Sequence, residues 1–249
     1  MSSPPLKIAI IGGGLIGHRH GSSVLTNPST TLTALVEPSP SGPSTAAFLH
    51  TTHYTSLSSL LASPHKPDAA IVCTPNNTHV SLSLELIEAG VHVLVEKPIS
   101  ESVEEGRVLV ERAREKGVKL LVGHHRRFNP YLLATKAHLS SSSLGKIIAV
   151  QGTWCLLKPA SYFEGTGGWR QEAGVVMINL IHEVDLLQFL LGPIVLVSAL
   201  ATSKTRGYKA EDGAVAMLRF ESGVVGTFVL SDAVPSPWSF EGGTGENPM

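Results

Sequence analysis

The sequence predicts an α/β protein in two parts: an N-terminal doubly wound parallel sheet, then an α+β domain on a mainly antiparallel sheet. Over residues 1–123, short apolar runs alternate with helical patterns, which is typical of parallel strands joined by crossover helices. Towards the C-terminus, strand patterns follow one another without intervening helices. The chain of 249 residues is long enough for two modest domains. We expect them to span residues 1–123 and 124–249.

Composition excludes several classes of protein. The chain is 43% hydrophobic and 16% charged, with a net charge of −1, so no basic surface indicates nucleic acid or an anionic membrane as partner. We find no apolar run approaching the length of a membrane span, and the first five residues lack the features of a signal peptide. Cys73 and Cys155 form neither a disulfide framework nor a metal-ligand cluster. These observations predict a cytoplasmic protein with free thiols and no bound metal.

The first expected strand, residues 7–11, ends abruptly at a glycine-rich turn before a helix that runs to about residue 25. The turn reads Gly12, Gly13, Gly14, Leu15, Ile16, Gly17. Gly12 permits a sharp turn, Gly14 lets a pyrophosphate approach the backbone, and Gly17 lets the helix pack against the strand. The helix N-terminus then offers N–H groups to the phosphates. A glycine-rich turn without a ligand is the alternative interpretation.

Glu37 follows the second expected strand, residues 31–36, about twenty residues after Gly17, as the dinucleotide fingerprint requires. A carboxylate there accepts hydrogen bonds from the ribose hydroxyls of the adenosine and repels a 2′-phosphate. The sequence therefore predicts NAD rather than NADP as cofactor. A solvated loop charge is the alternative.

The remaining N-terminal elements continue the alternation. We expect helices near 46–50, within 54–62, at 78–89 and at 103–116, and strands at 68–73, 91–95 and 118–122. Ligands of such a sheet bind at the carboxyl ends of its strands. Those ends lie at the glycine turn, Glu37, 74–76, 96–98 and 123–127.

The second domain is expected to begin with a polar junction at residues 124–130. A helix at 131–139, a strand at 146–157, a glycine-rich loop at 165–170 and an apolar helix at 175–191 follow. Strands are expected at 194–203, 213–220 and 224–230, the last two joined by a hairpin turn at 221–223.

Lys97 lies at the carboxyl end of an expected strand, between Glu96 and Pro98. A lysine in a cleft can hydrogen-bond a substrate hydroxyl and favour its ionisation, and Pro98 can bend the chain there through a cis peptide bond. A surface lysine at the start of a loop is the alternative.

Asn179, His182 and Asp185 are spaced by three along the last expected helix, so they share one stripe of its surface. His182 is a candidate general acid/base because imidazole titrates near neutrality, and Asp185 could orient it. The polar edge of an amphipathic helix is the alternative.

Likewise, the cluster at residues 124–127 fits either an anion site or a solvated face, and Trp169 beside Arg170 could belong to the core.

These motifs occur in the following order: the glycine turn at 12–17, Cys73-Thr74-Pro75-Asn76-Asn77-Thr78-His79, Glu96-Lys97-Pro98, the run at 123–130, Gly168-Trp169-Arg170 and His182-Glu183-Val184-Asp185-Leu186. Taken together they resemble the Gfo/Idh/MocA oxidoreductases, the glucose-fructose oxidoreductase and inositol dehydrogenase family. The resemblance covers nearly the whole chain, and Glu96-Lys97-Pro98 and His182-x-x-Asp185 are its more specific motifs.

The resemblance implies a Rossmann domain followed by an open sheet domain that is often used for oligomerisation. It implies catalytic roles for Lys97 and His182. It also implies that the cofactor is approached by Thr74, Pro75, Asn76, His79, Glu96, Lys97, Trp169 and Arg170.

Two departures from the family pattern affect the expected function. Many members carry an aspartate four residues before the catalytic histidine, where this chain has Ile178. The chain is also short for the family, so we expect the second domain to be incomplete. We therefore expect an NAD-dependent dehydrogenase acting on a secondary hydroxyl of a sugar, cyclitol or polyol, with a non-catalytic dinucleotide-binding regulatory protein as the alternative.

Overall fold

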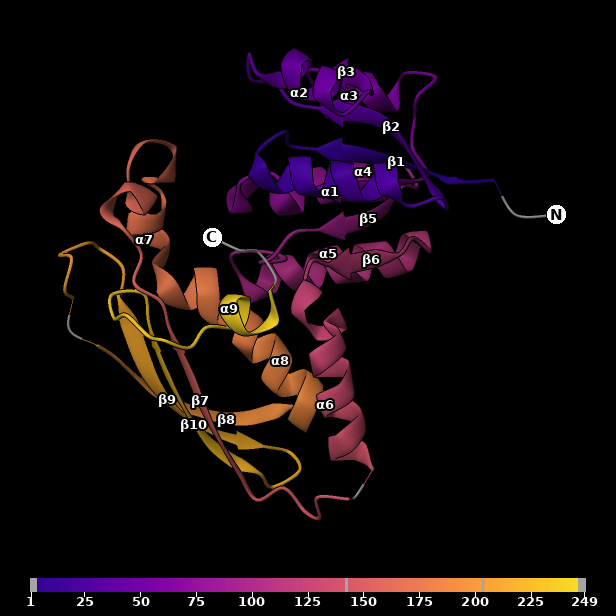
Figure 1. Cartoon of the computed structure of the whole chain (residues 1–249). Helices are drawn as coiled ribbons and strands as arrows, with labels where there is room; N and C mark the ends of the chain where they lie inside the picture. Colours follow the sequence, from indigo (N-terminus) through magenta and orange to yellow (C-terminus); the bar gives the residue numbers. More distant parts are fainter. Residues whose placement is uncertain (1–3, 142, 203, 246–249) are drawn as a thin grey trace. The chain divides into compact units, whose positions relative to one another are not determined.

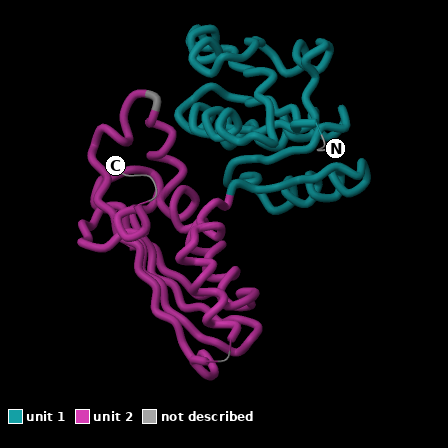
Figure 2. Tube along the Cα trace, turned by 45° about the vertical axis from the view of Figure 1, so that its right-hand side comes forward, with its two compact units in different colours: residues 1–123 teal, residues 124–249 magenta. Residues whose placement is uncertain are grey.

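The computed structural model describes residues 4–141, 143–202 and 204–245. The chain divides into two compact units, Met1–Gly123 and His124–Met249, which are coloured separately in Figure 2. Each unit has its own sheet and its own hydrophobic core. The two units are therefore described one at a time.

Unit 1 contains a six-stranded parallel sheet in the order β3-β2-β1-β4-β5-β6 (Figure 1). Its strands are β1 Leu6–Ile11, β2 Thr30–Val36, β3 Thr52–Tyr54, β4 Ala69–Val72, β5 His92–Val95 and β6 Leu120–Val122. Its α-helices are α1 Leu15–Thr26, α2 Gly42–Phe48, α3 Leu57–Leu61, α4 His79–Glu88 and α5 Val103–Lys116. The strand order reverses direction beside β1, so ligands are expected at the carboxyl ends of the strands there.

Strand β1 is buried on both faces because helices cover both sides of this sheet. Ala9 and Ile11 belong to a core that includes apolar residues of α3, α4 and α5, whereas Ile8 and Ile10 belong to a second core with residues of α1 and α2. Successive side chains of a strand point to opposite faces. A continuous apolar run in the sequence is therefore what a doubly covered strand requires.

Unit 2 is built on a four-stranded mixed sheet in the order β7-β10-β9-β8. The strands are β7 Ala149–Cys155, β8 Ile194–Ala201, β9 Gly213–Phe220 and β10 Val225–Ser231. β9 is antiparallel to both of its neighbours, and β10 pairs with β7 in parallel. The predicted fold class, a doubly wound parallel sheet followed by an α+β unit, is confirmed. Residue 203, at the end of the expected strand 194–203, lies outside the described residues.

The apolar helix predicted at 175–191 is interrupted in the structure. Helix α7, Arg170–Val175, contains a kink at Gly174 with a φ of 75°. A π-helical segment, Val176–Leu180, follows, and α8 spans Ile181–Leu191. A Cβ on Gly174 would come within 2.2 Å of a carboxylate oxygen of Glu211, so both the positive φ and the close packing favour glycine. The kink lies before residue 175, where the predicted helix begins, so only the π-helical segment interrupts that helix. The apolar pattern of residues 176–180 gives no sign of the change.

Within the described part of the chain, one helical stretch, Arg170–Leu191, is long and apolar enough to cross a membrane by length and composition alone. The stretch contains Glu172, Glu183 and Asp185, so it is not a continuous apolar run. The stretch carries the buried residues His182 and Asp185, and its Val175 and Leu187 pack into the core of the unit 2 sheet.

The remaining elements of unit 2 are helical. Helix α6 spans Pro130–Ser140 and α9 spans Phe240–Thr244. The side chain of Asn129 caps α6 by accepting the backbone N–H of Tyr131 at 2.9 Å, and Pro130 occupies the first position of the helix, where its missing N–H is tolerated. Helix α9 was not predicted from the sequence.

Candidate active site

The glycine turn after β1 is shaped by close backbone packing at two of its glycines. Gly12 has a φ of +101°, and a Cβ on it would lie 2.8 Å from the carbonyl oxygen of Cys73. A Cβ on Gly17 would lie 2.0 Å from the carbonyl oxygen of Gly12. These two glycines are therefore required by the protein itself, since any side chain would displace the turn from β4 or the helix from the turn.

Gly14 is different because a Cβ built on it meets nothing within 4 Å. It is the N-cap of α1, and among the described residues this helix has no side-chain N-cap hydrogen bond. The first N–H groups of a helix lack partners within the helix and favour anions. Open space beside these donors fits a pyrophosphate, and so the residues present fit a dinucleotide.

Glu37 lies at the end of β2, directly beside the glycine turn. Its Oε2 accepts the backbone N–H of Gly13 at 2.6 Å, and its Oε1 accepts that of Ser39 at 2.9 Å. Partial burial alone would raise the pKa of Glu37, but these hydrogen bonds, with the positive charge that His53 can carry, lower it overall. The group is therefore a carboxylate at neutral pH, as required to accept hydrogen bonds from ribose hydroxyls.

The stretch after β4 brings Thr74 and Asn76 to the same edge of the sheet, with the exposed Pro75 between them. His79 at the start of α4 is only 1% exposed. Its Nδ1 lies 2.7 Å from the carbonyl oxygen of Pro98 and its Nε2 lies 2.8 Å from that of Thr74. The ring therefore joins two loops inside unit 1, and this burial argues against the direct cofactor contact that the resemblance implies for His79.

The turn after β5 carries Glu96 and Lys97, and the peptide bond between Lys97 and Pro98 is cis. Glu96 Oε1 lies 2.7 Å from Nε2 of His20 in α1, and Oε2 accepts the backbone N–H of Lys97 at 3.2 Å. Burial alone would raise the pKa of Glu96, but His20, the Lys97 N–H and the charge of Lys97 lower it overall. Lys97 is half-buried at the carboxyl edge of the sheet, where the predicted active site of a doubly wound sheet lies.

His182 and Asp185 lie in the first turns of α8, and each is 8% exposed. The ring of His182 contacts that of His125 edge-on, with centroids 5.4 Å apart. Asp185 forms a bidentate ion pair with Arg127, in which Arg127 Nε donates to Oδ2 at 3.0 Å and Nη2 to Oδ1. The hydrogen bonds described for Asp185 thus go to Arg127, and a role in orienting His182 stays a prediction.

The π-helical segment lies immediately before His182 and contains both Ile178 and Asn179. Single π-helical turns within helices occur frequently at functional sites. Among the described residues, the Oδ1 atom of Asn179 is buried without a hydrogen-bond partner. An unsatisfied buried amide oxygen is costly, so this atom is available to accept a hydrogen bond from a ligand.

Trp169 and Arg170 form the entry to α7. Arg170 lies over the rings of Tyr162 and Trp169, with its Cζ 4.3 Å and 5.0 Å from their centroids, and its Nη1 donates to the Tyr162 carbonyl at 3.1 Å. Its Nε is buried without a hydrogen-bond partner among the described residues. Trp169 is 48% exposed, so the structure does not support placing it in the core.

Unit 2 contains a buried ion network that was not predicted from the sequence. Arg126 donates to Glu183 and, at 2.7 Å, to Glu241, and its guanidinium lies over the ring of Phe240 with Cζ 4.3 Å from the centroid. Burial raises the pKa of Glu183 although Arg126 opposes the shift. Arg126 and Glu241 are separated by 115 positions, so no local pattern could connect them. The sequence suggested only a polar cluster at 124–127.

The fold and the glycine turn together define a two-domain dinucleotide-binding protein with a Rossmann unit and an α+β unit. Residues 6–124 match the model of the oxidoreductase family with an NAD-binding Rossmann fold. Residues 132–243 match that of the GFO/IDH/MocA C-terminal domain. The chain therefore belongs to the Gfo/Idh/MocA family, which confirms the resemblance seen in its motifs.

Similar proteins include dehydrogenases and reductases of sugars and inositols. The chain is 34% identical over 182 residues to 1,5-anhydro-D-fructose reductase of Ensifer adhaerens, covering 70% of this chain and 53% of that protein. It is 26% identical over 189 residues to inositol 2-dehydrogenase of Rhizobium meliloti (strain 1021), covering 75% and 55%. The chain spans about half the length of these curated relatives.

Solved structures include the WlbA dehydrogenase from Bordetella pertussis in complex with NADH and UDP-GlcNAcA. It superposes with a TM-score of 0.87 at 28% identity, covering 94% of this chain and 69% of that one. Relatives differ in cofactor, because one Bacillus subtilis scyllo-inositol 2-dehydrogenase is named for NAD(+) and another for NADP(+).

Proposed function

We propose that the protein is an NAD-dependent dehydrogenase that acts on a secondary hydroxyl of a sugar, cyclitol or related polyol in the cytoplasm. The main support is the carboxyl edge of the unit 1 sheet. There the open turn at Gly14, the ionised Glu37 and the Lys97 turn follow strands β1, β2 and β5. Relatives that act on inositols and sugars support this substrate class.

The proposal assigns the cofactor choice to Glu37. Its carboxylate would accept hydrogen bonds from the ribose hydroxyls of NAD, replacing the N–H donors of Gly13 and Ser39. A 2′-phosphate at the same place would bring two negative charges together. NAD is therefore preferred over NADP in this proposal.

The proposal assigns one role to Lys97 of unit 1 and another to His182 of unit 2. A bound nicotinamide would supply the hydride acceptor. His182 would take the proton of a substrate hydroxyl and release it to water, and Lys97 would stabilise negative charge that develops on a substrate oxygen.

Cofactor reduction measured against a panel of polyols and sugars tests the proposal. With a substrate from this panel that the wild type oxidises, His182→Ala and Lys97→Ala should each lower kcat by a factor of about 10² to 10⁴. This is the usual contribution of acid/base groups. NAD affinity should change little for His182→Ala. Near-normal turnover of His182→Ala at every pH would remove His182 from the mechanism.

Asp185→Asn separates two roles of that carboxylate. If Asp185 orients His182, kcat falls, though by less than in His182→Ala. If Asp185 serves only the ion pair with Arg127, Tm falls while kcat at low temperature is kept, because the variant loses the charge-assisted hydrogen bonds between Arg127 and the buried Asp185 side chain.

A non-catalytic dinucleotide-binding regulator is the second candidate, and Ile178 supports it. An isoleucine at this position cannot replace the aspartate that many family members are expected to carry. NADH binding without turnover of any polyol in the panel would favour this candidate over the dehydrogenase.

A further inference from the structure

Lys158 is a half-buried cation of unit 2, three residues after the end of β7. Its backbone is held on both sides, because its N–H donates to the carbonyl oxygen of Asp232 at 2.9 Å and its carbonyl accepts Nη2 of Arg206 at 3.2 Å. The ammonium lies over two rings, 4.8 Å from the centroid of Tyr162 and 5.9 Å from that of Trp154. Among the described residues, no carboxylate pairs with it and no acceptor is hydrogen-bonded to it.

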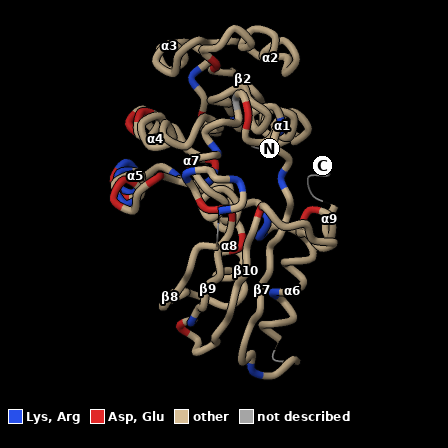
Figure 3. The backbone as a smooth tube through the Cα atoms, turned by 90° about the vertical axis from the view of Figure 1, so that its left-hand side faces the viewer, with Lys and Arg blue, Asp and Glu red and all other residues tan. Residues whose placement is uncertain are grey.

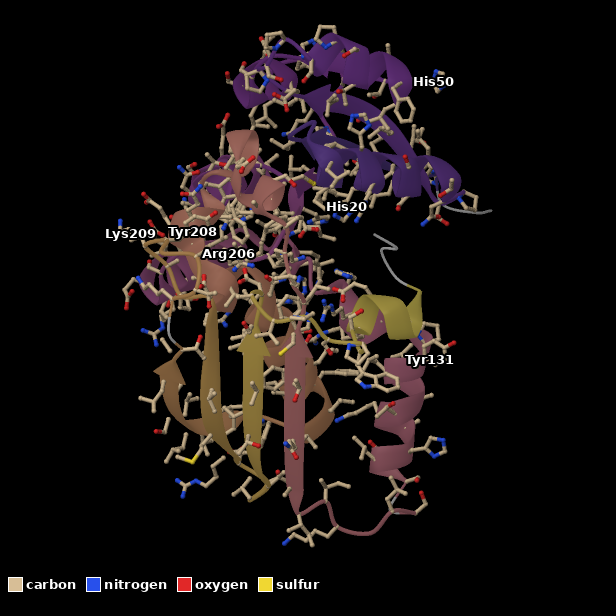
Figure 4. All side chains as sticks on the ribbon, turned by 60° about the vertical axis from the view of Figure 1, so that its left-hand side comes forward. His20, His50, Tyr131, Arg206, Tyr208 and Lys209 are labelled. Atoms are coloured by element: carbon tan, nitrogen blue, oxygen red, sulfur yellow. The ribbon has the colours of Figure 1, made fainter. Side chains whose placement is uncertain are left out.

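The carboxylates that act on Lys158 are bound to other cations. Asp232 pairs with Arg206, which is labelled in Figure 4. Glu241 accepts Nη2 of Arg126 at 2.7 Å. Burial lowers the pKa of Lys158, and although both carboxylates oppose this, the pKa remains below its ordinary value. The protein therefore holds a cation here without a counter-charge of its own.

Arg170 is a second cation that has no carboxylate partner in the described part of the chain. Its Cζ lies 4.3 Å from the centroid of the same Tyr162 ring, and its Nη1 donates to the Tyr162 carbonyl at 3.1 Å. Lys158 and Arg170 thus share one aromatic ring, and the charge of Arg170 is among the causes that lower the pKa of Lys158. Like charges this close repel, so an anion at Lys158 would relieve the repulsion.

Two further donors beside Lys158 and its ring lack an acceptor among the described residues. Trp154 is 3% exposed and its Nε1 is buried without a hydrogen-bond partner, as is Nε of Arg170. Neither atom can accept a hydrogen bond, so only an acceptor satisfies them. Oε2 of Glu241 is also buried without a partner, and this atom can accept a hydroxyl group.

These groups are connected to His182 within unit 2. Arg126, whose charge also lowers the pKa of Lys158, donates to Glu183, the residue after His182. An anion at Lys158 would therefore lie in the same region of the unit as the histidine to which the proposed function assigns proton transfer.

We propose that Lys158 binds an anionic group of the substrate, a carboxylate or a phosphate, and so restricts the substrate class to acidic sugars or acidic cyclitols. The oxygens of either group accept hydrogen bonds from ammonium, indole and guanidinium N–H donors. Hydroxyl groups of the same molecule supply a donor for Oε2 of Glu241. The inference rests on the proposed function, because it names the substrate of that site.

Protection of Lys158 from trace labelling with acetic anhydride measures occupancy without turnover, since only the unprotonated, uncovered amine reacts. The probes are D-glucuronate, D-galacturonate, D-glucose 6-phosphate and myo-inositol 1-phosphate, each beside its neutral parent, with inorganic phosphate and NADH as further arms. At saturation, at least one acidic probe should lower the labelling rate roughly tenfold, because it covers the amine and stabilises its protonated form. The exposed Lys146, before β7, is the reference in the same sample and should label unchanged.

The pattern of protection identifies the anion. Protection by the uronates assigns a carboxylate, and protection by the sugar or cyclitol phosphates assigns a phosphate. NADH is included because the family resemblance places Arg170 near the cofactor. Protection by NADH alone, by inorganic phosphate alone, or by the neutral parents as strongly as by the acids would overturn the proposal, and so would protection by no probe.

Variants test the charge itself by calorimetric titration with the protecting probe. Lys158→Gln should weaken binding about tenfold or more, because a charge-assisted hydrogen bond is lost, and Lys158→Arg should keep most of the affinity. Lys146→Gln makes the same charge change at the other end of β7 and should bind as the wild type does. Unchanged affinity in a folded Lys158→Gln would overturn the proposal, and the protection of wild-type Lys158 decides it if this variant does not fold.

Turnover separates this inference from the proposed function. If the wild type oxidises the acid faster than its neutral parent, Lys158→Gln should raise KM for the acid more than it lowers kcat, as expected for a binding group. Turnover of neutral polyols without protection of Lys158 would keep the proposed function and overturn the anion site. Protection by an acidic sugar without turnover of any probe would contradict the proposed function and retain the anion site.

Discussion

At the scale of single residues, the proposed preference for NAD depends on one carboxylate. Glu37 already binds two backbone N–H groups at the glycine turn, which keeps it ionised. The same atoms are the acceptors that a ribose needs. A residue that is preorganised without ligand loses little by exchanging one set of donors for another.

Replacing Glu37 by serine should narrow the gap between the two cofactors. We expect NADH affinity to fall about tenfold or more, as the loss of hydrogen bonds to a charged group predicts. NADPH affinity should rise because the repulsion of its phosphate is removed. Fluorescence titration with both reduced cofactors measures this, with Glu111→Ser on the exposed face of α5 as a control. Tighter binding of NADPH by the wild type would contradict the assignment.

At the scale of elements, different glycines of the glycine turn serve packing and ligand binding. Gly17 has a backbone oxygen 2.0 Å from the place of a Cβ, whereas Gly14 has open space. The same substitution at these two positions should therefore have different effects, although both belong to one motif.

Gly17→Ala should lower stability by about 1–3 kcal/mol through overpacking, seen as a lower urea midpoint, and should weaken NADH binding as well. Gly14→Ala should unfold at the wild-type midpoint and lose NADH affinity alone, because its methyl group would occupy the space left for the phosphates. If Gly14→Ala binds NADH as tightly as the wild type, the pyrophosphate does not approach Gly14.

Helix α8 also carries a pH-dependent contribution to stability. Burial raises the pKa of Glu183, with Arg126 opposing and Glu241 adding to the shift. A carboxyl group with a raised folded-state pKa binds its proton more tightly when folded. The contribution of Glu183 to the free energy of unfolding is therefore complete below its unfolded-state pKa of about 4.3. It is lost as the pH rises through the folded-state pKa.

Glu183→Gln should consequently gain stability relative to the wild type as the pH rises from about 4.5 to 7.5. The gain is about 1.4 kcal/mol for each pH unit by which the folded-state pKa of Glu183 exceeds its unfolded-state pKa. Urea unfolding at a series of pH values measures this difference. Glu221→Gln, on the exposed turn between β9 and β10, should show no such trend. A constant difference between Glu183→Gln and wild type across this range would show that Arg126 fully compensates the burial.

At the scale of the whole molecule, the unit 2 sheet has one face without a covering layer. The residues of β8 and β9 that point away from the helices include Leu200, 79% exposed, Met217, 58% exposed, and Val215. Arg219 is the one charged residue in the four strands of this sheet, which is almost free of blue and red in Figure 3. Apolar surface of this kind favours association.

We expect the protein to self-associate through this face. Leu200→Lys combined with Met217→Lys should lower the apparent mass in size-exclusion chromatography with light scattering. Val108→Lys on α5 of unit 1 also replaces an exposed apolar side chain by lysine, and it should leave the apparent mass unchanged. A wild-type protein that is monomeric at every concentration tested would contradict this prediction.

The sequence by itself determined the order of the elements other than α9 and the π-helical segment, the two sheets and the glycine turn. These features follow from local causes: apolar runs identify doubly covered strands, and glycine is needed where a backbone atom leaves no room for a Cβ. The motifs around Lys97 and His182 identified the family because each motif is a contiguous run of residues, which can be recognised without knowing the fold.

The tertiary structure decided what each polar group of these motifs binds. It assigned Asp185 to Arg127, Glu96 to His20 and Arg126 to Glu183 and Glu241. It also placed a π-helical segment within residues 175–191, a stretch that reads as one helix. Such outcomes depend on which distant segments pack together, and side-chain periodicity carries no information about the partner across 58 or 76 positions of chain.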